Sequence, residues 1–292
     1  MITGVFPPIP TPFFQDEVAY DKLKFNLNKM NETDFTGYVV LGSNGENVHL
    51  TKEEKIKIIE SVRDVCPENK IVIAGTGSDC YKDTIELTNH AADFGINYAL
   101  VITPYFYKSN MNDVSISEFY TRIADSARIP VILYNVPKFT NVNISPGLVF
   151  ELSAHPNIVG IKNSTENIAG LSEMVNVTKD DFSVIVGTAT VFYPGLCVGA
   201  VGGILALANI ASSECLKVYN HMNSGNHEKA LETHRKLLTV DRAIVKRHGL
   251  PGLKTAMDFL GYYGGPPRLP LREVSEKTKS DIKVFLEKAE LL

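Results

Sequence analysis

Short apolar runs rich in Val and Ile alternate along the chain with longer stretches in which apolar residues recur at helical spacing. This alternation predicts strand–helix units that form a parallel sheet with helices packed outside it. The predicted strands lie near residues 4–8, 38–41, 71–74, 98–102, 131–134, 159–162, 184–186 and 203–205. Eight such strands favour closure of the sheet, so the predicted fold class is α/β, a (β/α)8 TIM barrel.

Local signals mark where the helices begin. Thr51 and Glu54 have the spacing of a capping box that opens a helix reaching about residue 65, and Ser145 precedes Pro146 as a cap before proline at the first helical position. After a helix at about 213–223 the pattern is purely helical, over residues 228–246, 252–260 and 276–291. We therefore expect a barrel catalytic domain over residues 1–224 and, over residues 225–292, a C-terminal helical extension of the same domain.

Composition and charge narrow the class of partner. The chain is 44% hydrophobic and 21% charged, with a net charge of −4 and no block of like charge. This is an ordinary globular composition, and it argues against nucleic acid and membrane surfaces as partners. The N-terminal residues show no secretory or mitochondrial presequence pattern, which predicts a cytoplasmic location, with a mitochondrial one as the alternative if a presequence has been removed.

The cysteines and histidines give no support to a metal site. The four cysteines, at positions 66, 80, 197 and 215, lack the short paired spacings of zinc ligands, and the seven histidines form no cluster. We expect reduced thiols, no metal and no cofactor.

Lys162 is the strongest candidate for chemistry. It closes the apolar run at residues 157–161, which is predicted as a buried strand. An amine in apolar surroundings is less readily protonated and can attack a carbonyl carbon to form a Schiff base. The alternative is a loop lysine whose ammonium reaches solvent.

Two other strand ends carry polar side chains. The turn at residues 42–46 (GSNGE) follows the apolar stretch 37–41, and Tyr134 follows the stretch 130–133. The C-terminal ends of barrel strands converge on one mouth, so these side chains and Lys162 are expected to face one pocket. Hydrogen-bond donors of Ser43 and Asn44 could hold a carboxylate beside an amine and a phenol. That combination suits a 2-oxo acid.

These motifs resemble the dihydrodipicolinate synthase and N-acetylneuraminate lyase superfamily of class I aldolases. The resemblance runs from Gly4 through Leu271 and rests on residues 7–13, 42–46, 103–105, 134–137, 155–164, 199–203 and 208–209. Within the superfamily the chain is most similar to the 4-hydroxy-2-oxoglutarate aldolase branch. That similarity lies in residues 42–46, 155–162, 250–254 and 261–266.

The resemblance implies a role for each matching position. Lys162 matches the Schiff-base lysine and Tyr134 the phenol that moves protons to and from the substrate. The matching substrate-binding positions are Ser43 and Asn44 for the carboxylate, Ser164 for a further contact, and Ile204 for a contact through its backbone carbonyl. The resemblance also implies a small-molecule 2-oxo acid as substrate, with pyruvate as product or co-substrate, and a homotetramer.

Four positions depart from the pattern of the superfamily. Phe139 stands where the synthases have an arginine, and Phe106 stands where a second tyrosine is usual, flanked by Tyr105 and Tyr107. Residues 189–190 (AT) replace the Asp-Glu pair that holds the polyol chain in neuraminate lyases. The second phenol of a proton relay is therefore in question.

The predicted function is a Schiff-base-forming pyruvate aldolase that cleaves 4-hydroxy-2-oxoglutarate to pyruvate and glyoxylate. A 2-keto-3-deoxy sugar acid is the nearest alternative substrate, and dihydrodipicolinate synthesis is a third, weakened by Phe139. A non-catalytic barrel that binds 2-oxo acids and a metal-dependent aldolase are alternatives of other classes.

Overall fold

The structure is a computed structural model that describes all of residues 1–292. Its eight parallel strands follow the order β1-β10-β9-β8-β7-β6-β5-β4, and with the helices between them they have the topology of the predicted (β/α)8 barrel. The chain divides into two compact units, one made of Met1–Gly4 and Ile71–Ile204, the other of Val5–Lys70 and Leu205–Leu292. The expected boundary at residue 225 stays a prediction. No helix combines the length and the apolar composition needed to cross a membrane.

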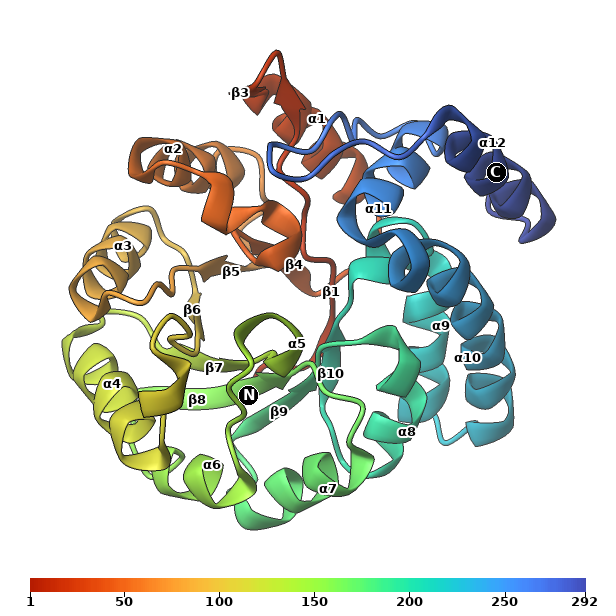
Figure 1. Cartoon of the computed structure of the whole chain (residues 1–292). Coiled ribbons are helices and arrows are strands. Elements are labelled where there is room, and N and C mark those ends of the chain that lie inside the picture. The colour runs from red at the N-terminus through yellow and green to blue at the C-terminus, as the bar shows by residue number, and fades with distance from the viewer. The chain divides into compact units, whose positions relative to one another are not determined.

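The first unit is built on consecutive parallel strands. Its strands are β5 (Ile71–Gly75), β6 (Tyr98–Ile102), β7 (Val131–Asn135), β8 (Ile158–Asn163), β9 (Ser183–Val186) and β10 (Gly202–Ile204), and β1 (Gly4–Phe6) begins at its edge. Its helices are α3 (Tyr81–Asp93), α4 (Asp113–Ser126), α5 (Pro137–Thr140), α6 (Pro146–Leu152), α7 (Ile168–Val177) and α8 (Phe192–Cys197), with short 3₁₀ turns η3 (Lys108–Asn110) and η4 (Ala189–Val191). Figure 1 shows α4, α6 and α7 on the outer side of strands β7 to β9.

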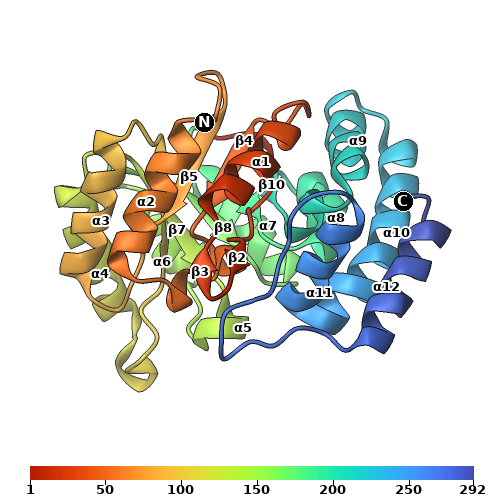
Figure 2. The ribbon, with the colours of Figure 1, turned by 90° about the horizontal axis from the view of Figure 1, so that it is seen from above.

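The second unit combines the early strands with the C-terminal helices. It contains β2 (Phe13–Phe14), β3 (Glu17–Val18), β4 (Gly37–Val40), α1 (Tyr20–Met30), α2 (Lys52–Arg63), and the 3₁₀ turns η1 (Ser43–Gly45), η2 (Asn47–His49) and η5 (Ala206–Asn209). Its later helices are α9 (Ser212–Asn223), α10 (His227–Asp241), a π-helical turn η6 (Arg242–Lys246), α11 (Arg247–Phe259) and α12 (Glu276–Lys288). Helix α9 packs on α10, and α11 packs on α12 (Figure 2).

The predicted strands and helix caps are confirmed. Each of the eight predicted strands is present, with ends that differ by a few residues at most. The capping box is complete, because Glu54 N donates to Thr51 Oγ1 at 3.2 Å and Thr51 N donates to Glu54 Oε2 at 2.9 Å. Ser145 Oγ accepts from Leu148 N at 3.1 Å.

The C-terminal helices differ from the prediction of one helix over residues 228–246. Helix α10 ends at Asp241, and a π-helical turn joins it to α11. Inside α11 the chain kinks at Gly249, whose φ of 60° is left-handed, and Pro251 follows without a backbone donor. The β2–β3 hairpin is absent from the predicted elements, because its strands have two residues each and are too short for a periodic signal.

Strands β8 and β9 approach so closely at Gly160 that no side chain fits there. A Cβ at this position would lie 2.6 Å from the carbonyl oxygen of Ser183, which belongs to the partner strand. Two backbones cannot separate locally without breaking the ladder hydrogen bonds. The glycine therefore fixes the spacing of the strand that carries Lys162.

We expect Gly160→Ala to destabilise the protein by about 1–3 kcal/mol, because the added methyl overpacks the sheet. Gly147→Ala is the matched control, since a Cβ there meets no atom closer than 3.9 Å. Urea denaturation of both variants measures the difference. Equal stability of the two variants would contradict the close approach.

Within the second unit, Arg268 of the C-terminal segment forms a two-pronged ion pair with Glu54 of helix α2. Its Nη1 and Nη2 donate to Glu54 Oε2 at 2.7 Å and Oε1 at 2.8 Å. The pair is largely buried, with side chains 14% and 15% exposed. The hydrogen bonds from Arg268 are the largest cause of a lowered pKa of the Glu54 carboxyl.

Because the pKa of Glu54 is lowered on folding, its stabilising contribution is complete above the ordinary value of 4.5 and declines as the pH falls through the lowered value. We expect Glu54→Gln to lose less stability than wild type between about pH 6 and about pH 3. Glu118→Gln, which removes an ion pair with side chains 57% and 61% exposed, should follow the wild-type curve. Parallel curves for Glu54→Gln and wild type would contradict this role of the pair.

Candidate active site

The pairing of β7 with β8 places Tyr134 directly opposite Lys162. Lys162 Nζ lies 4.1 Å from the centroid of the Tyr134 ring. Both residues are buried, with 4% and 5% of their surfaces exposed. The structure therefore brings together the two residues that the sequence predicts as catalytic, an amine and a phenol at neighbouring strand ends.

A ladder of buried amides fixes these two strand ends. Asn135 Nδ2 donates to Asn163 Oδ1 at 2.9 Å and to Asn143 Oδ1 at 3.0 Å, and Asn163 Nδ2 donates to Thr165 Oγ1 at 3.1 Å. Asn135 and Asn163 directly follow Tyr134 and Lys162 and are also paired in register. The sequence analysis missed the ladder, although an asparagine after each predicted catalytic residue was its signal.

Ser164 and Ile204 lie on the β9 side of Lys162. Ser164 Oγ donates to the Gly187 carbonyl at 3.4 Å, and a Cβ on Gly187 would lie 2.0 Å from Ser164 Oγ. Ile204 is fully buried and ends β10, which pairs with β9. The hydroxyl of Ser164 is thus confined to one place at the strand end, while the substrate contacts implied for Ser164 and Ile204 stay predictions.

A chain of hydroxyls ends at Glu166 in the same unit. Thr188 Oγ1 is 3.1 Å from Thr190 Oγ1, and Thr190 Oγ1 donates to Glu166 Oε1 at 2.9 Å. Thr190 is one of the two residues that replace the Asp-Glu pair of neuraminate lyases. Side chains that donate and accept hydrogen bonds therefore follow strands β8 and β9.

Two of the departures from the superfamily pattern, Phe106 and Phe139, lie at the surface. Phe106 and Tyr107 are 73% and 70% exposed, on a loop whose Tyr105 N and Phe106 N donate to Asp79 Oδ1 at 2.7 and 2.9 Å. Phe139 is 61% exposed, and Lys138 Nζ lies 5.8 Å from its ring. Neither Phe106 nor Tyr107 is buried as Tyr134 is.

Ser43 and Asn44 belong to the second unit, whereas Lys162, Tyr134, Ser164 and Ile204 belong to the first. The two residues open the 3₁₀ turn η1, which begins after β4. Asn44 Nδ2 is buried without a hydrogen-bond partner. A buried donor of this kind is costly to leave unpaired, so its amide is available to an acceptor such as a carboxylate oxygen.

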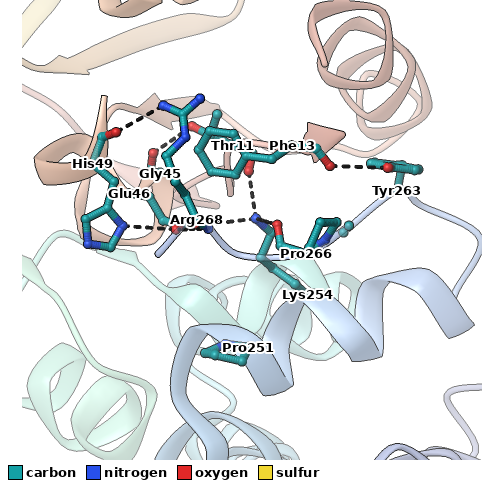
Figure 3. A network of polar contacts seen from close by, with 12 residues as sticks. Thr11, Phe13, Gly45, Glu46, His49, Pro251, Lys254, Tyr263, Pro266 and Arg268 are labelled. Atoms are coloured by element: carbon teal, nitrogen blue, oxygen red, sulfur yellow. Dashed lines mark hydrogen bonds and ion pairs between the residues drawn. The ribbon is translucent and has the colours of Figure 1, made fainter. Parts of the chain in front are cut away.

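Glu46, at the end of this turn, is the centre of a polar network that the sequence analysis did not predict (Figure 3). Lys254 Nζ of α11 donates to Glu46 Oε1 at 2.9 Å, and Arg268 N donates to Glu46 Oε2 at 2.9 Å. Glu46 and Lys254 are 2% and 1% exposed. Lys254 lies in the motif at residues 250–254 that carries the resemblance, but nothing in the pattern links it to the turn.

Comparison with known proteins identifies the family. The Dihydrodipicolinate synthetase family matches residues 1–289. The chain is 37% identical, over 99% of its length and 97% of the relative's, to a 4-hydroxy-tetrahydrodipicolinate synthase of Methanothrix thermoacetophila. It is also 35% identical to a crystal structure of a dihydrodipicolinate synthase, with a TM-score of 0.93 and full coverage of both chains.

A further solved structure is that of YagE, a prophage protein of the dihydrodipicolinic acid synthase family from E. coli K12, in complex with pyruvate. It is 27% identical, with a TM-score of 0.94 and full coverage of both chains. The expected superfamily and fold are confirmed. The relatives named here that carry an enzyme name are called synthases, so the expected 4-hydroxy-2-oxoglutarate aldolase branch finds no support in these names. The chain belongs to the dihydrodipicolinate synthetase family and is an enzyme of its Schiff-base-forming, class I aldolase type.

Proposed function

We propose that the protein is a pyruvate aldolase that cleaves a 4-hydroxy-2-oxo acid, with 4-hydroxy-2-oxoglutarate, which gives pyruvate and glyoxylate, as the first candidate. The observation that carries the proposal is the buried amine of Lys162, 4.1 Å from the Tyr134 ring on the paired strand. Pyruvate binding by YagE supports the 2-oxo acid as the shared ligand. The motif at residues 42–46 and Ser164 support the hydroxyoxoglutarate branch through the resemblance.

In the proposed mechanism Lys162 Nζ attacks the 2-oxo carbon of the substrate to form a carbinolamine. Tyr134 gives its proton to the departing hydroxyl, water leaves and an iminium remains. The Tyr134 phenolate then takes the proton of the C4 hydroxyl while the C3–C4 bond breaks. The electrons of that bond flow into the iminium, which becomes an enamine, and the aldehyde departs.

Proton transfer to C3 and hydrolysis of the iminium release pyruvate and restore the amine. The electron sink is made from Lys162 itself, so this reaction calls for no cofactor. Ser43, Asn44, Ser164 and the Ile204 carbonyl keep the binding roles that the resemblance implies. The resemblance also implies a homotetramer, and the sequence predicts a cytoplasmic location. Both stay predictions.

Pyruvate with borohydride should label Lys162 irreversibly, because reduction of the iminium gives a stable secondary amine. Peptide mass mapping locates the label. Lys162→Arg serves as the control and should stay unlabelled. A label on another lysine such as Lys138, or no label at all, would refute the mechanism.

Tyr134→Phe should lower kcat by about 10²- to 10⁴-fold with the fold intact, because the phenol moves protons in the transition state. Steady-state kinetics together with circular dichroism measure both properties. A tyrosine with only a packing role would give near-normal kcat and reduced stability instead.

Two alternatives rest on specific observations. The synthase name of the relatives favours 4-hydroxy-tetrahydrodipicolinate synthase activity. The chain of hydroxyls from Thr188 through Thr190 to Glu166 suits a substrate with hydroxyls at its aldehyde end, such as a 2-keto-3-deoxy sugar acid. Phe139 argues against synthase activity. An aromatic ring cannot bind the carboxylate of aspartate semialdehyde by two parallel hydrogen bonds, as an arginine does.

Comparison of kcat/KM for the three reactions separates these alternatives. Phe139 is 61% exposed, so loss of a guanidinium partner there costs what hydrogen bonds to a charged group contribute, about 1.5–3 kcal/mol. This predicts a kcat/KM for condensation with aspartate semialdehyde on the order of 10- to 100-fold below that for hydroxy-oxo acid cleavage. Phe139→Arg should narrow the gap. A dominant semialdehyde reaction in wild type would assign the synthase function and give Lys138 the role of the missing cation.

A further inference from the structure

Glu46 holds a conformation that the turn requires and that a glutamate does not favour. Its φ of 54° and ψ of 34° are left-handed, and its backbone N donates to the Ser43 carbonyl at 3.3 Å to close the turn. A left-handed residue with a side chain costs about 1–2 kcal/mol. The turn that carries Ser43 and Asn44 therefore keeps its shape only while something holds Glu46.

Lys254 is placed to hold it. Besides Glu46 Oε1, its ammonium donates to the carbonyls of Thr11 and Pro266, each at 2.9 Å. Three donors thus meet three acceptors, and the ammonium also lies 4.8 Å from the Phe13 ring centroid. Figure 3 shows these contacts converging on Lys254 from separate segments of the chain. The ammonium has no further hydrogen to give, so its position is fixed.

Hydrogen bonds also hold the second carboxylate oxygen of Glu46 and the backbone of the turn. Glu46 Oε2 accepts from Arg268 N at 2.9 Å and lies 3.1 Å from His49 Nδ1. Thr11 Oγ1 donates to the Gly45 carbonyl at 2.6 Å. Thr11 therefore links the ammonium of Lys254 directly to the residue after Asn44.

A purely structural turn would not be expected to leave a donor unpaired inside it. Asn44 Nδ2 is buried and has no hydrogen-bond partner in the protein, which destabilises the fold unless a ligand supplies the acceptor. The network thus keeps Asn44 in a conformation that serves an acceptor from outside the chain. An ion pair with both side chains 1% exposed is also a weak source of stability, because desolvation offsets the attraction.

We propose that Lys254 is a positioning residue that, through Glu46, holds Ser43 and Asn44 in the geometry that binds the substrate carboxylate. Lys254 then belongs to the support of the substrate-binding turn, although it lies on the C-terminal helix α11. This inference rests on the proposed function of the turn.

The test uses the full chain and the borohydride trapping of pyruvate. In Lys254→Met, the pyruvate concentration for half-maximal labelling of Lys162 should rise at least about tenfold, because a misplaced turn weakens carboxylate binding. KM for the hydroxy-oxo acid should rise equally while kcat stays within about threefold of wild type. A general loss of stability would not produce this split.

Met257→Ala is the matched control, because this residue lies on the same helix and is fully buried, whereas the carboxylate of Glu46 bonds to Lys254, Arg268 and His49. It should lower Tm and leave the half-maximal pyruvate concentration unchanged. If Lys254→Met does not fold, the double variant Glu46→Gln with Lys254→Met removes both buried charges. It should fold and still need the raised pyruvate concentration.

A wild-type pyruvate requirement in folded Lys254→Met or in the double variant would overturn the inference. An equal rise in Met257→Ala would do the same. In both cases labelling of wild type shows that the Schiff-base chemistry of the proposed function stands. Failure of pyruvate to label wild type at all would instead refute the proposed function, and this inference with it.

Discussion

The pairing of β7 with β8 is the interaction on which the proposed chemistry depends. It sets Tyr134 beside Lys162 in strands whose residues are all buried except Val159, so the two side chains are held by the sheet itself. Asn135 and Asn163 join the same two strands one residue further on. The sheet therefore fixes the distance between the amine and the phenol before the substrate binds. Catalytic groups that are already in place need little reorganisation during the reaction.

The turn at residues 42–46 in the second unit is also held by a buried, hydrogen-bonded polar side chain. A buried polar residue follows closely after the predicted site residues, and a fixed partner satisfies it. Asn163 does this after Lys162, and Glu46 does it after Asn44, with Lys254 as its counter-ion. Buried polar groups are costly when unpaired, so each network favours one geometry strongly over its neighbours.

Sequence patterns predicted the eight strands, the caps at Thr51 and Ser145, and the candidates Lys162 and Tyr134, because these depend on local periodicity and strand ends. The Lys254–Glu46 pair joins residues 208 positions apart and has no local signal. The amide ladder has one, the asparagine after each predicted catalytic residue, but its pairing depends on strand register. The kink at Gly249 coincides with a glycine and with Pro251, and it lies between the predicted helices at 228–246 and 252–260. The substrate branch depends on a few side chains such as Phe139, whereas whole-chain similarity to the synthases mostly reflects the shared scaffold.

The central claim is that an iminium on Lys162 acts as an electron sink beside the phenol of Tyr134. Such an iminium makes the methyl protons of bound pyruvate exchangeable even when no aldehyde is present. Proton NMR of pyruvate with the enzyme in deuterium oxide tests this most directly. The account predicts enzyme-dependent loss of the methyl signal that is absent in Lys162→Met and much slower in Tyr134→Phe. Wild-type enzyme that leaves the methyl signal unchanged, or Lys162→Met that exchanges it at the wild-type rate, would contradict the account.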